Sequence, residues 1–458
     1  MKGGILALTL CLLPAAAFAG GAFSTTPNGT PVLWTGNVTW RAETGPIKGG
    51  SDGNGGGGGG GGGGCQLTKS LDISNSQAVD IVRAAFAAWD SVPNASINIV
   101  EGPSLGTDVT FDNIEDFWVG TFFGGTVGSS VTAEPCYSGV GDCLNSVIFD
   151  SSEVPERSIV DAIQGECARY NLLAFAAILP QQNNDPPQFT ISSPQLKSSQ
   201  MVISGACVSP VIAPDPSCVG NPNFSSQCPA GGISLQDLQG TVTHEVGHYL
   251  GLDHTLVNKQ NYINCVTGSG TCDLEDIPTM IGFFVPGANL STLHYDDKVT
   301  FAKYYPASTM DVSGGKVIPG TCTIKGKVTQ SNGTTPLRCE EVVARLNNDP
   351  STAASFISGS EVRRFTQGVP GLSGTSGKTQ SNCNPDTGQT CGDYEIRGLT
   401  PGTYHLGTHD FKGGGNLAGF VLEPCTPALA DDAQLDNDDQ MTVNCVANTV
   451  QTQDLKSN

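Results

Sequence analysis

The chain has 458 residues, with 22 lysines and arginines against 43 aspartates and glutamates, which gives a net charge of −21. This acidic balance argues against nucleic acid or an anionic membrane surface as a partner, because both repel negative charge. The length also exceeds that of one ordinary domain, so we expect at least two.

The N-terminus predicts export. Residues 1–19 contain Lys2, then an apolar run at 5–13, then small residues at 17–19 before Gly20. This is the pattern of a secretory signal peptide with its cleavage site. We therefore expect a mature, secreted and extracellular chain that starts at Gly20. No later stretch approaches the roughly 20 apolar residues that a transmembrane helix needs.

The cysteines also favour an oxidising compartment. Cys11 lies inside the predicted signal, which leaves fifteen of the sixteen cysteines in the mature chain. Cys-x2-Cys pairs, which would favour a cysteine-ligated zinc, are absent. Because fifteen is odd, one cysteine must be free, paired between molecules or left unpaired after processing. Close pairs predict disulfides: Cys136 with Cys143, Cys265 with Cys272, and Cys383 with Cys391.

Residues 20–306 mix strand and helix patterns. A strand-like segment at 32–41 precedes residues 51–64, whose glycine run cannot bury a core and predicts a flexible surface loop. A helix is expected from Ser76 to just before Pro93, with one apolar stripe. Short apolar runs then predict strands of a twisted mixed sheet covered by helices, an α+β arrangement: 96–100, 109–111, 146–149 and 172–179.

The most informative motif lies at 244–254. On a helix, His244 and His248 lie one turn apart on the same face, and Glu245 stands beside them. Gly251 can close the helix and turn the chain so that His254 returns to the same point. Three imidazoles leave one position of a tetrahedral zinc to water, which is typical of a catalytic site. The alternative is a buried amphipathic helix whose histidines are only hydrogen-bonded.

At these residues the chain resembles the metzincin zinc peptidases, and Thr255 after the third histidine resembles the serine of the matrixin branch. Asp276-Ile277-Pro278-Thr279-Met280 is similar to the methionine turn that lies beneath the metal in that family. The resemblance implies that Gly251 and Met280 support the zinc site. It also implies hydrolysis of peptide bonds by a zinc-bound water, with Glu245 as the general base.

The resemblance further implies where substrate binds. The segment around Leu173 and Ala174 resembles the matrixin edge strand that pairs with the substrate. After the methionine, this chain continues Ile281-Gly282-Phe283-Phe284 where matrixins have an aromatic residue and a proline that wall the specificity pocket. Phe283 is the expected pocket residue. Protein or peptide substrates are the partners that this function requires.

The pattern changes after residue 306. Residues 293–305 resemble the closing matrixin helix, and residues 307–319 are expected to be a linker. Short alternating segments bounded by glycine and proline then predict an all-β sandwich at 320–447, followed by a tail at 448–458. The turn Gly-Leu-Thr-Pro-Gly-Thr-Tyr at 398–404 resembles the prealbumin-like module of carboxypeptidase regulatory domains. The ligand of this module cannot be inferred.

Two further hypotheses remain open. The acidic run at 431–439 favours a solvated loop over a calcium site, since no segment has the spacing of a calcium-binding loop. The alternative function is a secreted binding or adhesion protein whose metal domain is catalytically silent. The intact Glu245 argues for the enzyme. If the sandwich is only a spacer, a chain ending near Ala307 should fold and keep its zinc.

Overall fold

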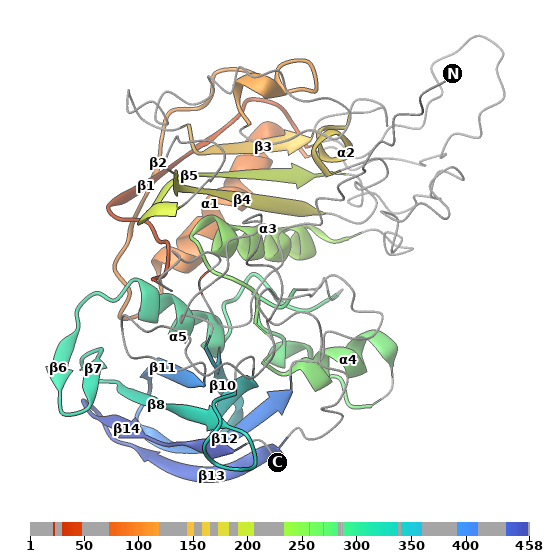
Figure 1. Cartoon of the computed structure of the whole chain (residues 1–458). Helices are drawn as coiled ribbons and strands as arrows, with labels where there is room; N and C mark the ends of the chain where they lie inside the picture. The colour runs from red at the N-terminus through yellow and green to blue at the C-terminus, as the bar shows by residue number, and fades with distance from the viewer. Residues whose placement is uncertain are drawn as a thin grey trace, which may run out of the picture.

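The structure is a computed structural model with a mixed α/β architecture, several sheets and few helices (Figure 1). The predicted signal peptide 1–19, the glycine-rich segment 51–64 and the cysteine pairs at 136/143 and 383/391 lie outside the residues that it describes. The described residues are 22, 30–47, 73–118, 144–150, 158–164, 173–182, 191–205, 233–255, 257–268, 270–282, 285, 287–337, 340–359, 392–410 and 437–456.

The first sheet has five strands in the order β2-β1-β3-β5-β4. All neighbouring pairs are parallel except β4 and β5, which are antiparallel, so the sheet is mixed and β4 forms its edge. The strands are β1 (Asn37–Ala42), β2 (Asn98–Glu101), β3 (Ser146–Asp150), β4 (Ala174–Gln182) and β5 (Ile191–Ser204).

The run at 109–111 is not a strand, contrary to the prediction. Val109 is fully buried, but its backbone N–H donates to the carboxylate of Glu43 instead of to a neighbouring strand. The run therefore buries its apolar side chain and satisfies its backbone donor without entering the sheet. A short 3₁₀ helix, Ile114–Asp116, follows it.

Two long helices, α1 (Asn75–Asp90) and α3 (Leu235–Tyr249), pack against each other, and α3 also contacts β4 and β5 (Figure 1). Ser74, not Ser76 as predicted, caps α1. Its side chain accepts a hydrogen bond from the N–H of Gln77, whose side chain accepts one from the N–H of Ser74. Ser76 cannot form this capping box, because the residue three positions later is valine.

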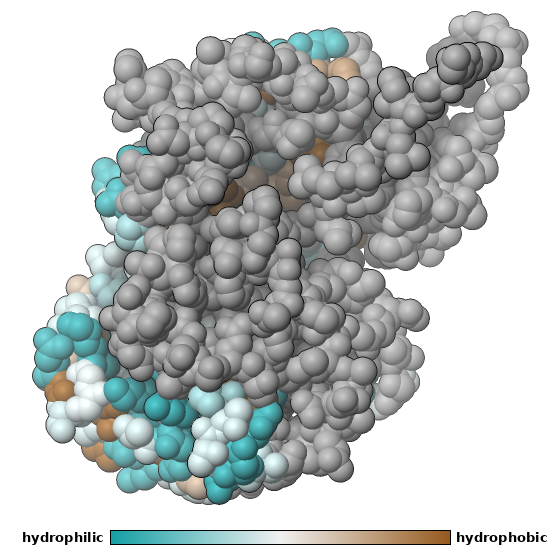
Figure 2. Space-filling model, viewed as in Figure 1, coloured by the Kyte–Doolittle hydropathy of each residue, from teal (hydrophilic) through white to brown (hydrophobic). Residues whose placement is uncertain are grey.

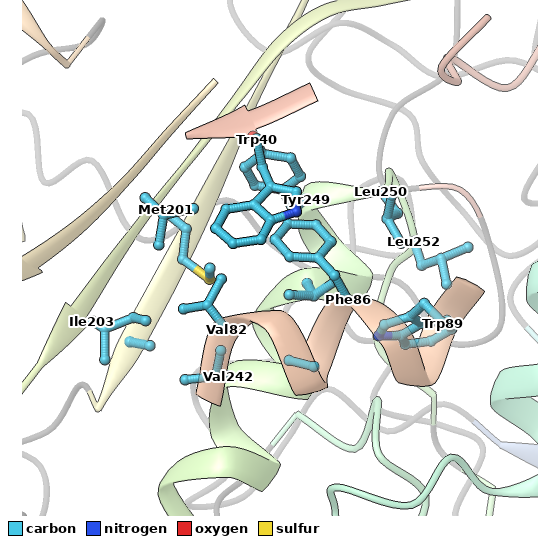
Figure 3. Packing of buried hydrophobic residues seen from close by; sticks show 14 of the residues in the cluster. Trp40, Val82, Phe86, Trp89, Met201, Ile203, Val242, Tyr249, Leu250 and Leu252 are labelled. Carbon is cyan, nitrogen blue, oxygen red and sulfur yellow. The ribbon is translucent and has the colours of Figure 1, made fainter. Parts of the chain in front are cut away.

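The core between these helices and the sheet is rich in aromatic side chains (Figure 3). Trp40 of β1 stacks on Phe86 of α1 with ring centroids 5.0 Å apart, and Phe86 meets the ring of Tyr249 edge-on at 5.3 Å. The hydroxyl of Tyr249 also donates to the carbonyl of Asn145 at 2.8 Å. These contacts fix the C-terminal end of α3 against the sheet.

The remaining helices are shorter. The helix predicted within 293–305 is α5 (Tyr295–Tyr304), whereas α2 (Ile159–Gln164) and α4 (Lys259–Thr267) were not predicted. A disulfide joins Cys265 of α4 to Cys272, as the close spacing of this pair predicts. A second 3₁₀ helix spans Leu274–Asp276.

After α5 the described chain forms only strands. One sheet has the order β10-β9-β12-β13, and in a second sheet β8 lies between β11 and β14 and also pairs with β15. The small hairpin β6–β7 lies within 307–319, and β14 and β15 lie within 448–458. The strands are β6 (Met310–Val312), β7 (Gly315–Val317), β8 (Cys322–Thr329), β9 (Glu340–Leu346), β10 (Asp349–Ile357), β11 (Asp393–Leu399), β12 (Gly402–Asp410), β13 (Asn437–Cys445), β14 (Val450–Thr452) and β15 (Leu455–Lys456).

One hydrophobic core is shared by both of these C-terminal sheets. It contains Ile324 of β8 and Ile396 of β11 from one sheet, and Val342 of β9 and Leu406 of β12 from the other. A disulfide between Cys322 and Cys445, which the sequence did not predict, joins β8 of one sheet to β13 of the other. The visible surface of this part is largely hydrophilic (Figure 2). In the part of the chain that the structure describes, no helix is long and apolar enough to cross a membrane.

Candidate metal centre

Helix α3 carries the first two histidines. The side chain of Ser234 accepts from the N–H of Asp237, and the carboxylate of Asp237 accepts from the N–H of Ser234, which forms a capping box. Within this helix, His244 and His248 are one turn apart and their ring centroids lie 4.7 Å apart. The helix therefore presents both imidazoles to one point.

The third histidine returns to that point after a sharp turn. Gly251, with φ +89°, follows the end of α3, and a Cβ there would lie 3.2 Å from a methyl group of Leu196. Both the backbone angle and the space favour glycine. As a result, Nε2 of His254 lies 3.0 Å from Nε2 of His244 and 2.9 Å from Nε2 of His248.

Backbone carbonyls set the tautomers of two imidazoles. Nδ1 of His244 lies 2.7 Å from the carbonyl oxygen of Thr279, and Nδ1 of His248 lies 2.8 Å from that of Leu252. Because a carbonyl only accepts, each Nδ1 carries the proton, and each Nε2 turns a lone pair toward the other imidazoles. His254 carries at most one Nε2 proton, so within the triad it can donate to only one of these two acceptors at a time.

A metal ion satisfies this arrangement. Bonds of about 2.0–2.1 Å from a tetrahedral zinc would place ligand nitrogens about 3.3 Å apart, close to the distances between the Nε2 atoms here. The ligating nitrogens of the three histidines all lie within 4.8 Å of one another. The carbonyls bound to Nδ1 are the outer partners that orient metal-binding histidines. The residues present therefore fit a metal ion held by His244, His248 and His254.

Burial keeps the imidazoles in their metal-binding form. Desolvation lowers the pKa of His244 to about 4 and that of His248 to about 3. The pKa of His254 also falls well below its ordinary value, first through burial and then through its two histidine neighbours. All three are therefore neutral near pH 7, so metal uptake does not have to displace protons from them.

Glu245 is on α3 beside His244, and its carboxyl contacts strand β4 at one edge of the sheet. Burial raises the pKa of its carboxyl to about 8, and a hydrogen bond from the backbone N–H of Ala176 opposes this increase. Ala176 belongs to β4, the edge strand. A cation held by the triad would lower this pKa again, since positive charge favours the carboxylate. The position and acidity of Glu245 suit a group that accepts and returns a proton.

Met280 lies against the C-terminal part of α3, at Gly247. It is buried, and a Cβ added to Gly247 would lie 2.8 Å from the ring of Trp89 and closer still to the sulfur of Met280. The backbone N–H of Thr255 donates to the carbonyl of Met280 at 2.8 Å. The turn at Met280 is thus joined to the loop that follows His254.

Asp297 of α5 fixes this turn through hydrogen bonds to its backbone. Its buried carboxylate accepts from the backbone N–H groups of Thr279 at 2.9 Å, Met280 at 3.0 Å and His294 at 2.7 Å. Since Thr279 supplies the carbonyl that orients His244, Asp297 acts on the metal centre through the turn. The sequence offered one signal for it, an acidic residue in the first turn of the helix, but not its partners.

The predicted substrate residues are only partly placed. Leu173 and Ala174 are buried at the start of β4, where the carbonyl of Leu173 accepts from the N–H of Ser204. Phe283 lies outside the described residues. The β4 residue that contacts Glu245 is Ala176, which the sequence did not single out. An uninterrupted apolar run does not reveal which position of the strand faces the site.

A calcium site finds no support among the described residues. There, the only group of three or more histidine, cysteine, aspartate or glutamate side chains placed to hold a metal is the histidine triad. Most of the acidic run at 431–439 lies outside the described residues, and its end belongs to β13. Comparison with known proteins adds nothing further: no family model, no curated protein and no solved structure matches this chain.

Proposed function

We propose that this chain is a secreted zinc metalloendopeptidase, similar to the matrixin branch of the metzincins. The observation that carries the proposal is the convergence of three imidazole Nε2 atoms, together with the buried carboxyl of Glu245, which is next to His244 on the same helix. The neutral imidazoles and their nitrogen ligand set suit zinc. The glycine turn at Gly251 and the buried Met280 support the resemblance to the metzincins.

The proposed reaction is hydrolysis of a peptide bond. A zinc ion held by the triad would lower the pKa of a coordinated water to about 7 and polarise the scissile carbonyl. Glu245 takes a proton from the attacking water and returns it to the leaving amine, so the carboxylate is regenerated in each cycle. The N–H of Ala176 holds this carboxylate toward β4.

Strand β4 is the proposed docking edge for the substrate. In the described residues it pairs only with β5, and a strand at a sheet edge is where an extended peptide adds in this mode of recognition. A peptide added there would run beside α3, because Ala176 of this strand contacts Glu245. Backbone hydrogen bonds would then hold the peptide irrespective of its sequence, and side-chain pockets would select among peptides.

The C-terminal sheets are proposed to form a prealbumin-like β-sandwich. Their shared core, which includes Ile324 and Val342 from opposite sheets, supports a sandwich. The turn at 398–404 supports the prealbumin-like assignment, although no ligand follows from it. The acidic net charge supports protein or peptide substrates over nucleic acid.

Digestion of a mixed peptide library by the purified mature protein tests this function. We expect endoproteolytic cleavage that stops when a chelator removes the metal and returns when zinc is restored. Glu245→Gln should keep its zinc and lose activity by about 10²- to 10⁴-fold, because it lacks the proton acceptor. If zinc-loaded wild-type protein cleaves no peptide, the alternative of a binding or adhesion protein with a silent metal domain is favoured.

A further inference from the structure

Helix α5 lies between the first sheet with its helices and the C-terminal sheets, and it packs against both (Figure 1). Phe301 of this helix is part of the core beneath the first sheet, whereas Val299 is part of the core between the C-terminal sheets. The ammonium group of Lys303 lies 3.4 Å from the centre of the Phe356 ring of β10. The two halves are therefore joined by shared packing.

Strand β10 also reaches the loop that follows the third histidine. Asp296 of α5 accepts from the backbone N–H of Ser355 at 2.6 Å and is hydrogen-bonded to the hydroxyl of Thr255. The hydroxyls of Thr255 and Ser355 lie 3.5 Å apart. Next to these residues, Val257 packs against Val343 and Ala353 of the C-terminal sheet. All of these contacts are buried.

Thr255 is the point at which these contacts meet the metal centre. It directly follows His254, and its N–H donates to the carbonyl of Met280 at 2.8 Å. Its hydroxyl contacts Asp296 and also accepts from the N–H of Val257 at 3.2 Å. Movement of this residue would leave buried polar groups without partners, which costs about 1–3 kcal/mol for each group. The loop is therefore held by two residues outside it, Met280 and Asp296.

We propose that the C-terminal sheets are a positioning part of the metal centre, and that β10, acting through Asp296 and Thr255, fixes the loop that carries His254. This inference rests on the proposed metal site. Ser355, Asp296 and Thr255 then affect both the affinity of the site for the ion and its coordination geometry. This role also argues against the expectation that a chain ending near Ala307 keeps an intact site.

The test compares variants of the full-length mature protein. Asp296→Ala removes the acceptor for Ser355, and Thr255→Val removes only a hydroxyl. The matched control is Tyr295→Phe on the same helix. This substitution removes a hydroxyl that accepts from the N–H of Thr400 at 2.8 Å. The lost bond is also between α5 and the C-terminal sheets, but it does not involve the loop after His254. Each variant is loaded with zinc or cobalt and its free energy of unfolding is measured.

The readouts are the rate of zinc release to excess chelator and the absorption spectrum of bound cobalt. Loss of outer-shell partners weakens metal binding by about 10- to 100-fold, so we expect release to accelerate by that factor in Asp296→Ala and Thr255→Val, with an altered cobalt spectrum. Tyr295→Phe should match wild type in both. Asp296→Asn should recover much of the loss, because its amide oxygen can still accept from Ser355.

Each outcome decides the proposal. If Asp296→Ala and Thr255→Val hold zinc as wild type does, the positioning role is wrong while the proposed function stands. If Tyr295→Phe changes zinc release equally, general loosening of the interface accounts for the effect and the specific role is wrong. Absence of zinc binding by wild-type protein removes both proposals. If Asp296→Ala fails to fold, the milder Thr255→Val decides alone.

Discussion

The close approach of Gly247 to Met280 predicts that Gly247→Ala damages both stability and metal binding. Alanine in a helix interior is favoured over glycine by about 1 kcal/mol. Against this, the added methyl group would lie 2.8 Å from the buried ring of Trp89 and closer still to Met280. Overpacking costs about 1–3 kcal/mol, so we expect a net loss of about 1 kcal/mol, with the larger cost setting the sign.

The added methyl group of Gly247→Ala should also affect metal binding, because it displaces Met280. Displacing Met280 moves the turn whose Thr279 carbonyl orients His244, so zinc release should accelerate. Gly240→Ala is the matched control on the same helix. Its methyl group would lie 2.9 Å from Cβ of Leu290 and not against Met280, so it should lose stability with a smaller effect on zinc release than Gly247→Ala.

Chemical denaturation and zinc release to a chelator measure these two effects separately. In Gly247→Ala/Met280→Ala, the space vacated by the sulfur should accept the new methyl group. The two substitutions should therefore be non-additive, with a coupling of about 0.5–3 kcal/mol in the free energy of unfolding. The reasoning is refuted if Gly247→Ala is as stable as wild type and releases zinc at the same rate, or if the two substitutions are additive.

Two further predictions concern buried carboxyls. Burial raises the pKa of Glu43 from 4.5 to about 9, so the folded state favours the protonated form and stability falls as pH rises between these values. The free energy of unfolding should fall by about 1.4 kcal/mol per pH unit in wild-type protein, and Glu43→Gln should flatten this slope. Denaturation curves at pH 5 and pH 8 measure it. An equal slope in both proteins contradicts the prediction. Asp297→Ala leaves three buried N–H donors unpaired and should cost at least about 3 kcal/mol, whereas Asp311→Ala, on the surface, should cost almost nothing.

Local features of the metal centre were predictable from sequence because they depend on helix geometry. The spacing of His244 and His248 places them on one helical face, the capping box at Ser234 starts that helix, and Gly251 permits the turn after it. Each of these rules involves residues only a few positions apart. The same holds for the disulfide between Cys265 and Cys272.

Contacts between distant segments were not predictable. Asp297 binds the turn at Met280, and Asp296 meets Ser355 on a strand 59 residues away. Nothing in the local pattern of either aspartate distinguishes it from an ordinary first-turn acid. The run at 109–111 has the composition of a strand, yet Glu43 takes its backbone donor. In these cases contacts with distant segments determine the conformation of a segment and the role of a side chain. A single sequence does not show which segments meet.

Elemental analysis of purified mature protein tests the central claim, that His244, His248 and His254 hold one zinc ion. Wild-type protein should contain one zinc per chain, because three buried neutral imidazoles converge on one point. His248→Ala should lose it, since two imidazoles cannot complete the site. Full zinc content in folded His248→Ala, or none in zinc-supplied wild-type protein, would contradict the assignment.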